Sequence, residues 1–343
     1  MNNLFKQFKS NKKVLWIVLT VVLIITLSLA FFLTRKKANS LISDKILEQS
    51  ESEQLSLFSS YECINGSVIK LFENKSGSYV FIDEKGDKIY TTEDNVQYFR
   101  MLDEKSLVYV VSKFDSEANK ISQEVKFTNL DNLNTVTIYS GENILLEVAN
   151  GTIYILNYTN GDFLYGTFDN LSKSTIGKPI SKVVCNKGHL FVINYSVINS
   201  LIRSTIYSID NEKIEEVSLV EGEVQSITVD YDNDNLIYYS TSVLNSDSSG
   251  SKIFVYSKYL KDLSPNSSGL KRYTNLNSNI ISLKDRYITL DTENNSVVLL
   301  NSNFSKVKVI NYYHKDSLKS LIKESSNSEK IFFIDQSGKL ISE

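Results

Sequence analysis

The sequence has little of the chemistry on which most enzymes depend. Its 343 residues include only 2 histidines, 2 cysteines and 1 tryptophan. Neither G-x-G-x-x-G nor G-x-x-x-x-G-K-[ST] occurs, so the chain lacks the familiar loops that hold a phosphate. It also lacks a G-x-S-x-G turn that would expose a serine nucleophile. These absences disfavour nucleotide-dependent catalysis and hydrolysis by a serine, histidine and aspartate triad.

The two histidines have ordinary structural explanations. His189 opens the apolar run HLFVI, and we expect it to pack at the edge of a strand. His314 lies in the polar segment YYHKD, which is typical of a connection between strands. We therefore assign neither histidine a catalytic role.

Cysteine and proline are equally scarce. Cys63 and Cys185 lie far apart, and no CxxC pair or Cys/His cluster is present to bind zinc. Each cysteine lies in or beside an apolar run, which favours a buried thiol, although a disulfide outside the cell stays open. The only prolines are Pro179 and Pro265, so no proline-rich linker divides the chain.

Charge is distributed unevenly along the chain. Residues 1–37 hold 7 basic and no acidic residues, which leaves 30 basic and 40 acidic residues in the remainder. Phosphate contacts require lysine or arginine, so this excess of acid disfavours nucleic acid and anionic lipid as ligands of the remainder. The rest of the chain is therefore not expected to bind nucleic acid.

A long apolar run occurs once, at Val14–Leu33. These 20 residues carry no charge, and at about 1.5 Å per residue a helix of that length matches a hydrocarbon core of roughly 30 Å. A cleaved signal peptide is the alternative, but its apolar region is usually about 7–15 residues and ends at small residues. Here the basic segment 35–37 follows almost at once. We predict an uncleaved transmembrane helix at residues 14–33.

The orientation of this helix rests on a small difference in charge. Four lysines and the free amine precede it, whereas three basic residues follow it. The positive-inside rule then places the tail, residues 1–13, in the cytoplasm. We expect a single-pass protein of the cell membrane whose C-terminal domain is extracytoplasmic, and the inverse topology stays open. Residues 34–60 are predicted to form a stalk.

From residue 61 onward the chain is predicted to be almost entirely β-strand. Short runs rich in Val, Ile, Tyr and Phe alternate with turns rich in Asn, Asp, Ser and Gly. The strongest runs start about 28 to 51 residues apart, which brackets the length of a four-stranded repeat. These runs are Tyr79–Asp83, Leu107–Val111, Thr152–Leu156, His189–Ile193, Leu236–Ser240, Tyr287–Asp291 and Ile331–Asp335.

One repeat shows all four strands, and the two ends of the domain resemble each other. Residues 280–310 contain four apolar segments joined by short turns, as an antiparallel meander requires. The segment 80–89 is similar to the segment 332–341 near the C-terminus. We therefore expect a strand from Ser60–Leu71 to complete the last repeat and close a ring, which removes exposed strand edges.

Residues 61–343 resemble an all-β fold, a β-propeller of about seven four-stranded blades, preceded by one transmembrane helix. The resemblance is to the architecture and not to a functional family. Trp16, the only tryptophan, excludes the Trp-Asp repeats of WD40 proteins, and the paired glycines of kelch repeats are absent. A β-sandwich or jelly roll followed by a second β domain is the alternative arrangement.

The sharpest local motif is the segment DYDNDN. Asp230, Asp232 and Asp234 alternate as in the first part of a calcium loop, and carboxylates so spaced on a tight turn can converge on Ca²⁺. The acid that would close such a loop is missing, because Thr241 and Tyr238 occupy the positions where it would fall. A solvated hairpin turn is the favoured interpretation, and calcium binding is a hypothesis.

Without a catalytic constellation, the sequence favours a non-catalytic binding or scaffold module. We expect it to be tethered to the membrane through residues 14–33 and to present its loops to a protein or glycan of the cell envelope. An envelope polysaccharide hydrolase or lyase with carboxylates in the propeller channel is one alternative. A structural subunit of a membrane complex is another.

Overall fold

The computed structural model describes residues 55–64, 67–115, 120–244, 251–260, 272–274, 280–284, 286–291, 296–311, 318–323, 331–338 and 340–342. The chain divides into two units, Met1–Leu55 and Ser56–Glu343. The predicted anchor at residues 14–33 and the predicted stalk up to residue 54 lie outside the described residues, as does His314. Within the described ranges, no helix has the length and apolar character needed to cross a membrane.

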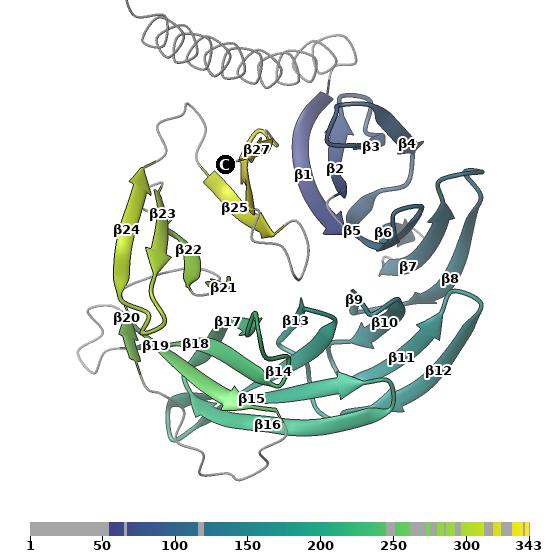
Figure 1. The fold of residues 1–343 in the computed structure, drawn as a ribbon. Coiled ribbons are helices and arrows are strands. Elements are labelled where there is room, and N and C mark those ends of the chain that lie inside the picture. Colours follow the sequence, from purple (N-terminus) through teal and green to yellow (C-terminus); the bar gives the residue numbers. More distant parts are fainter. Residues whose placement is uncertain are drawn as a thin grey trace, which may run out of the picture. The chain divides into compact units, whose positions relative to one another are not determined.

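The described strands form seven sheets (Figure 1). The first two hold β1 (Leu55–Ile64), β2 (Ser67–Asn74), β3 (Tyr79–Ile82), β4 (Lys88–Thr92), and β5 (Val96–Asp103), β6 (Ser106–Asp115), β7 (Lys120–Asn129), β8 (Thr135–Gly141). The next two hold β9 (Ile144–Ala149), β10 (Thr152–Asn157), β11 (Asp162–Thr167), β12 (Asn170–Thr175), and β13 (Lys182–Asn186), β14 (His189–Ile198), β15 (Leu201–Asp210), β16 (Lys213–Glu221). The remainder are β17 (Glu223–Val229), β18 (Leu236–Leu244), β19 (Ser251–Tyr259), β20 (Arg272–Thr274), then β21 (Ile280–Ser282), β22 (Tyr287–Asp291), β23 (Ser296–Leu300), β24 (Lys306–Asn311), and last β25 (Leu318–Lys323), β26 (Ile331–Asp335), β27 (Leu340–Ser342).

Each sheet is a meander in which consecutive strands pair. The first strands of successive sheets contact one another from β5 through β9, β13 and β17 to β21. The all-β propeller expected from the sequence is confirmed, as are the four strands expected within residues 280–310. The sequence predicted about seven four-stranded blades, whereas the described residues form six. Six sheets are four-stranded blades, and the last sheet has three strands among the residues described.

The expected closure of the ring by a shared strand is wrong. β1 and β2, which cover the segment Ser60–Leu71, both belong to the first sheet. A connection of two residues, 65 and 66, joins them, so pairing within the first sheet costs far less loop entropy than pairing with the distant last sheet. Side chains bridge the ends instead. Gly338 lies against the rings of Phe58 and Phe72, where a Cβ atom at position 338 would come within 2.7 Å of Phe58.

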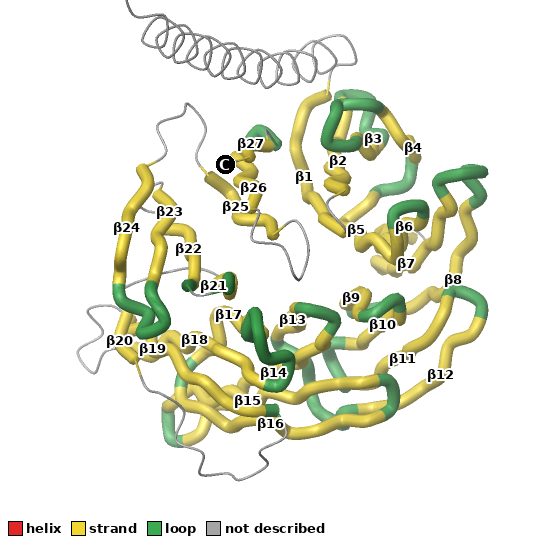
Figure 2. The backbone as a smooth tube through the Cα atoms, viewed as in Figure 1, coloured by secondary structure: helices red, strands yellow, loops and turns green. Residues whose placement is uncertain are grey.

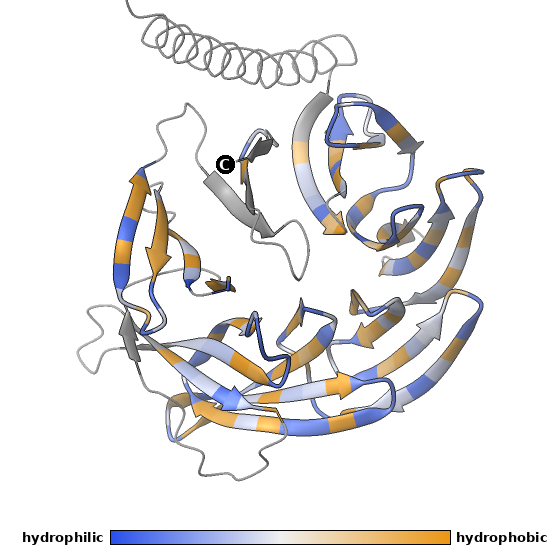
Figure 3. Ribbon diagram, in the orientation of Figure 1, coloured by the Kyte–Doolittle hydropathy of each residue, from blue (hydrophilic) through white to orange (hydrophobic). Residues whose placement is uncertain are grey.

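Apolar side chains fill the space between neighbouring sheets. The first interface combines Leu71 and Phe81 from the first sheet with Phe99 and Tyr109 from the second, and the rings of Phe81 and Phe99 meet edge to face with centroids 5.1 Å apart. Similar clusters lie between the second and third sheets, the third and fourth, and the fourth and fifth. Each interior sheet therefore buries both of its faces. Along outer strands such as β16, polar and apolar residues alternate (Figure 3).

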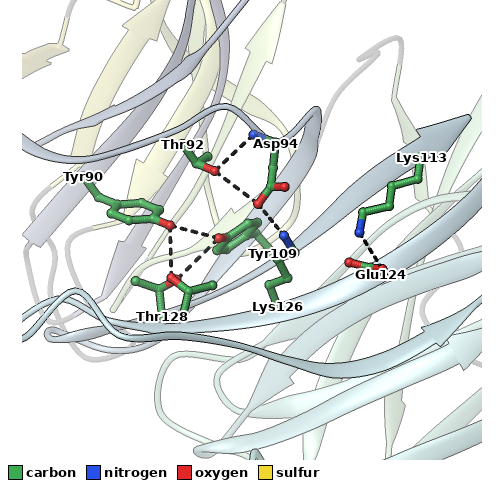
Figure 4. A network of polar contacts seen from close by, with 9 residues as sticks. Tyr90, Thr92, Asp94, Tyr109, Lys113, Glu124, Lys126 and Thr128 are labelled. Carbon is green, nitrogen blue, oxygen red and sulfur yellow. Dashed lines mark hydrogen bonds and ion pairs between the residues drawn. The ribbon is translucent and has the colours of Figure 1, made fainter.

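Hydroxyl groups add a polar bond between the first two sheets (Figure 4). The Tyr90 hydroxyl on β4 lies 3.2 Å from the Tyr109 hydroxyl on β6. The Thr128 hydroxyl on β7 completes this group at 3.4 Å from Tyr109. Nearby, the Lys126 ammonium donates to an Asp94 carboxylate oxygen at 2.6 Å, so the connection between β4 and β5 is also bound to the second sheet.

The turns of the propeller divide between two faces, as the tube in Figure 2 helps to follow. First strands of all blades in a propeller run in the same direction, so equivalent turns lie on the same side of the ring. One side carries the turns from first to second and from third to fourth strands. We call it the acidic face, defined by residues 83–87, 103–105, 130–134, 210–213 and 230–235. The other side carries the turns from second to third strands. We call it the hairpin face, defined by residues 74–79, 157–162 and 195–203.

Lys70 on β2 is a lysine without exposed surface, and its ammonium nitrogen has no hydrogen-bond partner. Burial lowers its pKa from 10.5 to about 8. The folded state therefore binds this proton less tightly than the unfolded state. The charged ammonium lowers the free energy of unfolding fully below pH 8, and this destabilisation disappears as pH rises from 8 to 10.5.

Replacing Lys70 by methionine should therefore stabilise the chain at pH 7, by roughly 3 kcal/mol from a shift of this size. The difference in free energy of unfolding between the two chains should shrink as pH rises to 10.5. Urea unfolding followed by circular dichroism measures both. A natural chain as stable as Lys70→Met at pH 7 would show that the ammonium has found a partner.

Candidate functional site

The first strands of the blades enclose a central channel of about 770 Å³. Residues of β1, β5, β9, β13, β17 and β21 line it. Its charged lining residues are Glu62, Arg100, Glu147, Lys182 and Lys187. Acidic and basic side chains thus share one cavity, and their contacts decide what chemistry the cavity can support.

Arg100 is the centre of a cluster that joins three blades. Its guanidinium donates to both carboxylate oxygens of Glu147 at 2.8 and 2.7 Å, and to Glu62 at 2.7 Å. It also donates to the carbonyl of Phe99 at 3.0 Å. β1, β5 and β9 carry Glu62, Arg100 and Glu147 in turn, so one side chain cross-links the inner strands of the first three sheets. Bidentate contacts of this kind fix geometry as well as charge.

The cluster holds one positive charge against two negative charges. Burial raises the pKa of Glu62, Arg100 opposes this rise and Glu147 adds to it, and the net result is a pKa of about 7. The Glu62 side chain keeps 26% of its surface exposed, and it lines the channel. Near neutral pH, Glu62 therefore exchanges its proton, and the cluster changes between neutral and negative.

The opposite wall of the channel is basic. Lys182 on β13 donates from its ammonium to the carbonyl of Gln225, and burial lowers its pKa. The hydroxyl groups of this wall are also bonded within the protein. Ser226 bonds Ser240 at 2.9 Å, and Ser282 accepts from the amide of Tyr231 at 3.0 Å. The charged groups that line the described channel therefore each contact a protein partner.

This arrangement differs from a glycosidase pair. Such enzymes need one carboxylic acid and one carboxylate that both face the sugar. Here Arg100 binds both Glu62 and Glu147, and Tyr61 is the aromatic residue among the lining residues described. Glu62 has the raised pKa that an acid catalyst requires. The carboxylate beside it is already neutralised by the guanidinium.

The three aspartates of the predicted calcium loop lie in the turn between β17 and β18, on the acidic face. The carboxylate of Asp230 accepts from the amides of Asp232 and Asn233 at 3.0 and 3.1 Å, which closes an Asx turn. The Asp234 carboxylate accepts from the Lys187 ammonium at 2.6 Å, and this bond lowers the pKa of Asp234. The turn predicted here is confirmed, whereas calcium binding stays a hypothesis.

The Lys187 ammonium lies among the oxygens of this loop. Besides Asp234, it donates to the carbonyls of Asp230 and Tyr231, each at 3.0 Å. A lysine from the turn between β13 and β14 thus places one positive charge where backbone and carboxylate oxygens converge. Within the described ranges, no group of three His, Cys, Asp or Glu side chains has the arrangement of a metal site.

The two cysteines and His189 play structural parts. No disulfide joins Cys63 to Cys185, and both are half-buried. The Cys185 thiol donates to the carbonyl of Val148 at 3.2 Å, and burial raises its pKa to about 12, so it is not a reactive thiolate. His189 stacks on Phe191 with ring centroids 6.1 Å apart, and burial lowers its pKa.

The Arg100 cluster was missed by the sequence analysis. Its members lie 38 and 47 residues apart, so no local motif connects them. The available signal was a charged residue inside each of three apolar segments: Glu62 in YECI, Arg100 in FRML and Glu147 in LLEV. Aligning these strands as the first strands of successive blades would have brought the three charges to one channel wall.

Replacing Glu62 by glutamine tests the proton at the cluster. The folded-state pKa of about 7 exceeds the unfolded value of 4.5, so the natural side chain stabilises the fold most below pH 4.5 and loses that contribution by pH 7. The natural chain, measured relative to Glu62→Gln, should lose roughly 3 kcal/mol of unfolding free energy between these pH values. Urea unfolding at several pH values measures the slope, and a difference independent of pH would contradict the assignment.

Calcium binding can be tested by removing the Lys187 ammonium, which occupies the loop. Ca²⁺ at Asp230, Asp232 and Asp234 would have to displace or tolerate the Lys187 ammonium. Removing that charge in Lys187→Met should therefore strengthen Ca²⁺ binding by roughly tenfold or more. Calorimetry of the full chain gives the affinity, with Asp232→Ala as the control that should lose it. Absence of heat in both the natural chain and Lys187→Met would reject the site.

Comparisons with known proteins support the fold alone. No family model matches the chain, and no curated protein matches it. The propeller domain of the Trilobed protease from Pyrococcus furiosus, described as having an open velcro topology, is similar with a TM-score of 0.56 and 11% identity over 85% of this chain and 92% of that one.

Two enzymes with other activities share the architecture. Virginiamycin B lyase from Staphylococcus aureus has a TM-score of 0.53 and 13% identity over 82% of this chain and 93% of that one. The acylaminoacyl peptidase of Pyrococcus horikoshii has a TM-score of 0.54 and 9% identity, covering 85% of this chain and 51% of the peptidase. Because identity is this low, the comparisons establish a β-propeller and leave its activity to the site.

Proposed function

We propose that the chain is a membrane-tethered, non-catalytic binding module that presents its propeller to a protein or glycan partner of the cell envelope. The observation that carries this proposal is the internal pairing of the channel charges. Glu62 and Glu147 bind Arg100, Lys182 binds a backbone carbonyl, and Lys187 binds Asp234. A catalytic channel needs charged groups available to a substrate.

The acidic face supports the same proposal. Its turns carry many carboxylates, among them Asp83, Asp103 and Asp131. Several are held by local bonds: Asp83 accepts from the amides of Lys85 and Asp87, and Asp103 accepts from the amide of Lys105. A rigid set of acidic turns suits a partner that presents basic groups, and it favours fast association through electrostatic attraction.

The proposed location follows from the apolar run at residues 14–33. We place the protein in the cell membrane as a single-pass protein with the propeller outside the cytoplasm. Protease treatment of intact cells gives the direct test. The propeller should be cleaved without permeabilisation, whereas protection in intact cells and cleavage only after permeabilisation would assign the inverse topology.

The polysaccharide hydrolase or lyase is the second candidate, because Glu62 has a raised pKa within a large channel. The third is a structural subunit of a membrane complex. Incubating the full chain with envelope polysaccharide separates the first two functions. We expect no turnover. Turnover lost in Glu62→Gln and kept in Lys308→Gln, an exposed position on the outer strand β24, would replace binding by catalysis.

Partner binding is tested by photo-crosslinking in intact cells. A crosslinking residue in place of Asp131, on the acidic face, should give a discrete adduct with one protein or glycan. The same residue in place of Thr137, an exposed position on the outer strand β8, serves as the matched control. Equal adducts from both positions, or none from Asp131, would contradict binding through the acidic face.

A further inference from the structure

Two hairpins extend beyond the body of the propeller on the hairpin face. In the fourth blade, β14 and β15 pair as far as Ile198 with Leu201. Their neighbours stop earlier. β13 pairs only as far as Ile193, and β16 pairs as far as Arg203, after which the Gly222 amide donates to the Ile202 carbonyl at 2.8 Å. The tip therefore stands out as a two-stranded ribbon. In the second blade, β6 and β7 do the same, pairing beyond the last contacts of β5 and β8.

The ribbon of the fourth blade is apolar on both of its sides. Val197 pairs with Ile202, and Ile198 pairs with Leu201. Successive residues of a strand point to opposite faces, so each side of the ribbon carries one aliphatic pair. All four side chains are exposed, Val197 to 74% of its surface. Residues 190–202 contain no charge.

The second blade and the third add to this surface. Phe114 pairs with Ile121 on the ribbon of the second blade, and both are exposed by at least 60%. The charged pair of Asp115 and Lys120 follows at the end of the described ribbon. Lys113 next to Phe114 is neutralised by Glu124 at 2.7 Å (Figure 4). Tyr158, in the turn between β10 and β11, is exposed on the third blade, which lies between the second and the fourth. Three consecutive blades thus present apolar side chains to one side of the ring.

We propose that this face rests on the membrane that holds the anchor, with the tip of the fourth blade inserted into the boundary between lipid headgroups and acyl chains. The inference rests on the proposed membrane tether. A protein surface would cover one side of a ribbon, whereas lipid surrounds both, and both sides here are apolar. Arg203 follows Ile202 at the base of the tip, where basic side chains meet headgroups.

The course of the chain agrees with this orientation. β1 is a first strand, and its Leu55 end lies on the hairpin face, because its other end leads through residues 65 and 66 into β2. The tether therefore joins the propeller on the side that carries the apolar tips. The 21 residues from 34 to 54 span at most about 75 Å when extended. Such a short link raises the effective concentration of the tips at the bilayer, so even a weak contact between the tips and lipid would keep this face on the membrane.

The lipid class follows from charge. The chain beyond residue 37 has more acidic than basic residues, and Glu221 and Glu223 flank the connection from β16 to β17 on the hairpin face. Attraction to anionic headgroups is therefore not the cause of contact. Apolar insertion into zwitterionic lipid is expected, and it should be insensitive to salt.

Tryptophan fluorescence in the full chain tests the proposal. Trp16 is the only natural tryptophan, so a Trp16→Phe chain gives a silent background for Ile198→Trp and Val197→Trp, which report on the two sides of the ribbon. In vesicles of zwitterionic lipid, brominated acyl chains should remove about half of the emission of both variants, as expected for side chains at the headgroup boundary. Leu133→Trp, an exposed leucine of the acidic face, is the matched control and should keep its emission.

The outcomes separate this inference from the tether itself. A chain that fails to float with the vesicles removes the proposed tether. A chain that floats but keeps the emission of Ile198→Trp and Val197→Trp removes only the contact of the hairpin face. Quenching of one variant and not the other, or shielding that appears only after an envelope protein extract is added, would assign the tips to a protein partner and overturn the proposal.

Discussion

Packing of one sheet against the next is the interaction on which the rest of this structure depends. The middle strands carry apolar residues on both faces, as in β6, where Leu107, Val108, Tyr109 and Val110 have no exposed surface. A sheet of this kind cannot leave one face in water, so each must have a neighbour on either side. A ring of radially arranged sheets satisfies this requirement. It also brings the first strands together around a channel.

The ends of the ring are where this requirement is hardest to meet. No described strand is shared between the first and last sheets. Phe58, Phe72 and the turn at Gly338 make the contact instead, through side chains. Lys70 lies two residues before Phe72 on β2 and is buried without a hydrogen bond. This region therefore combines close apolar packing with an unpaired polar group. Arg100 acts in the opposite sense nearby, because its bonds to Glu62 and Glu147 fix β1 to the second and third sheets.

The channel and the two faces of the propeller differ in a way that bears on function. The charged side chains of the channel bond to other groups of the protein. The Lys187 ammonium also bonds the Asp230 carbonyl and the Asp234 carboxylate, where a metal ion would otherwise bind. The two faces remain available and differ in character. One carries acidic turns stabilised by side-chain bonds to the backbone, which suits a polar partner. The other carries two projecting ribbons with apolar pairs, which suits an apolar medium.

Much of the fold was determined by the sequence, because its signals are local. The strong apolar runs such as Leu107–Val111 and Leu236–Ser240 are strands, and the DYDNDN segment is a turn. Alternation and turn propensity act over a few residues, so a single chain reveals them. The proposed anchor at Val14–Leu33 rests on the same kind of local evidence.

Only the tertiary structure decided how the strands combine over distance. It gave β1 to the first sheet, left the last sheet with three described strands, and brought Glu62, Arg100 and Glu147 to one wall of the channel. It also showed that Val197 and Ile198 lie past the ends of the neighbouring strands. The contacts between blades join residues that are distant in the sequence, 38 positions apart for Arg100 and Glu62, and no local pattern in one sequence shows which of these contacts form.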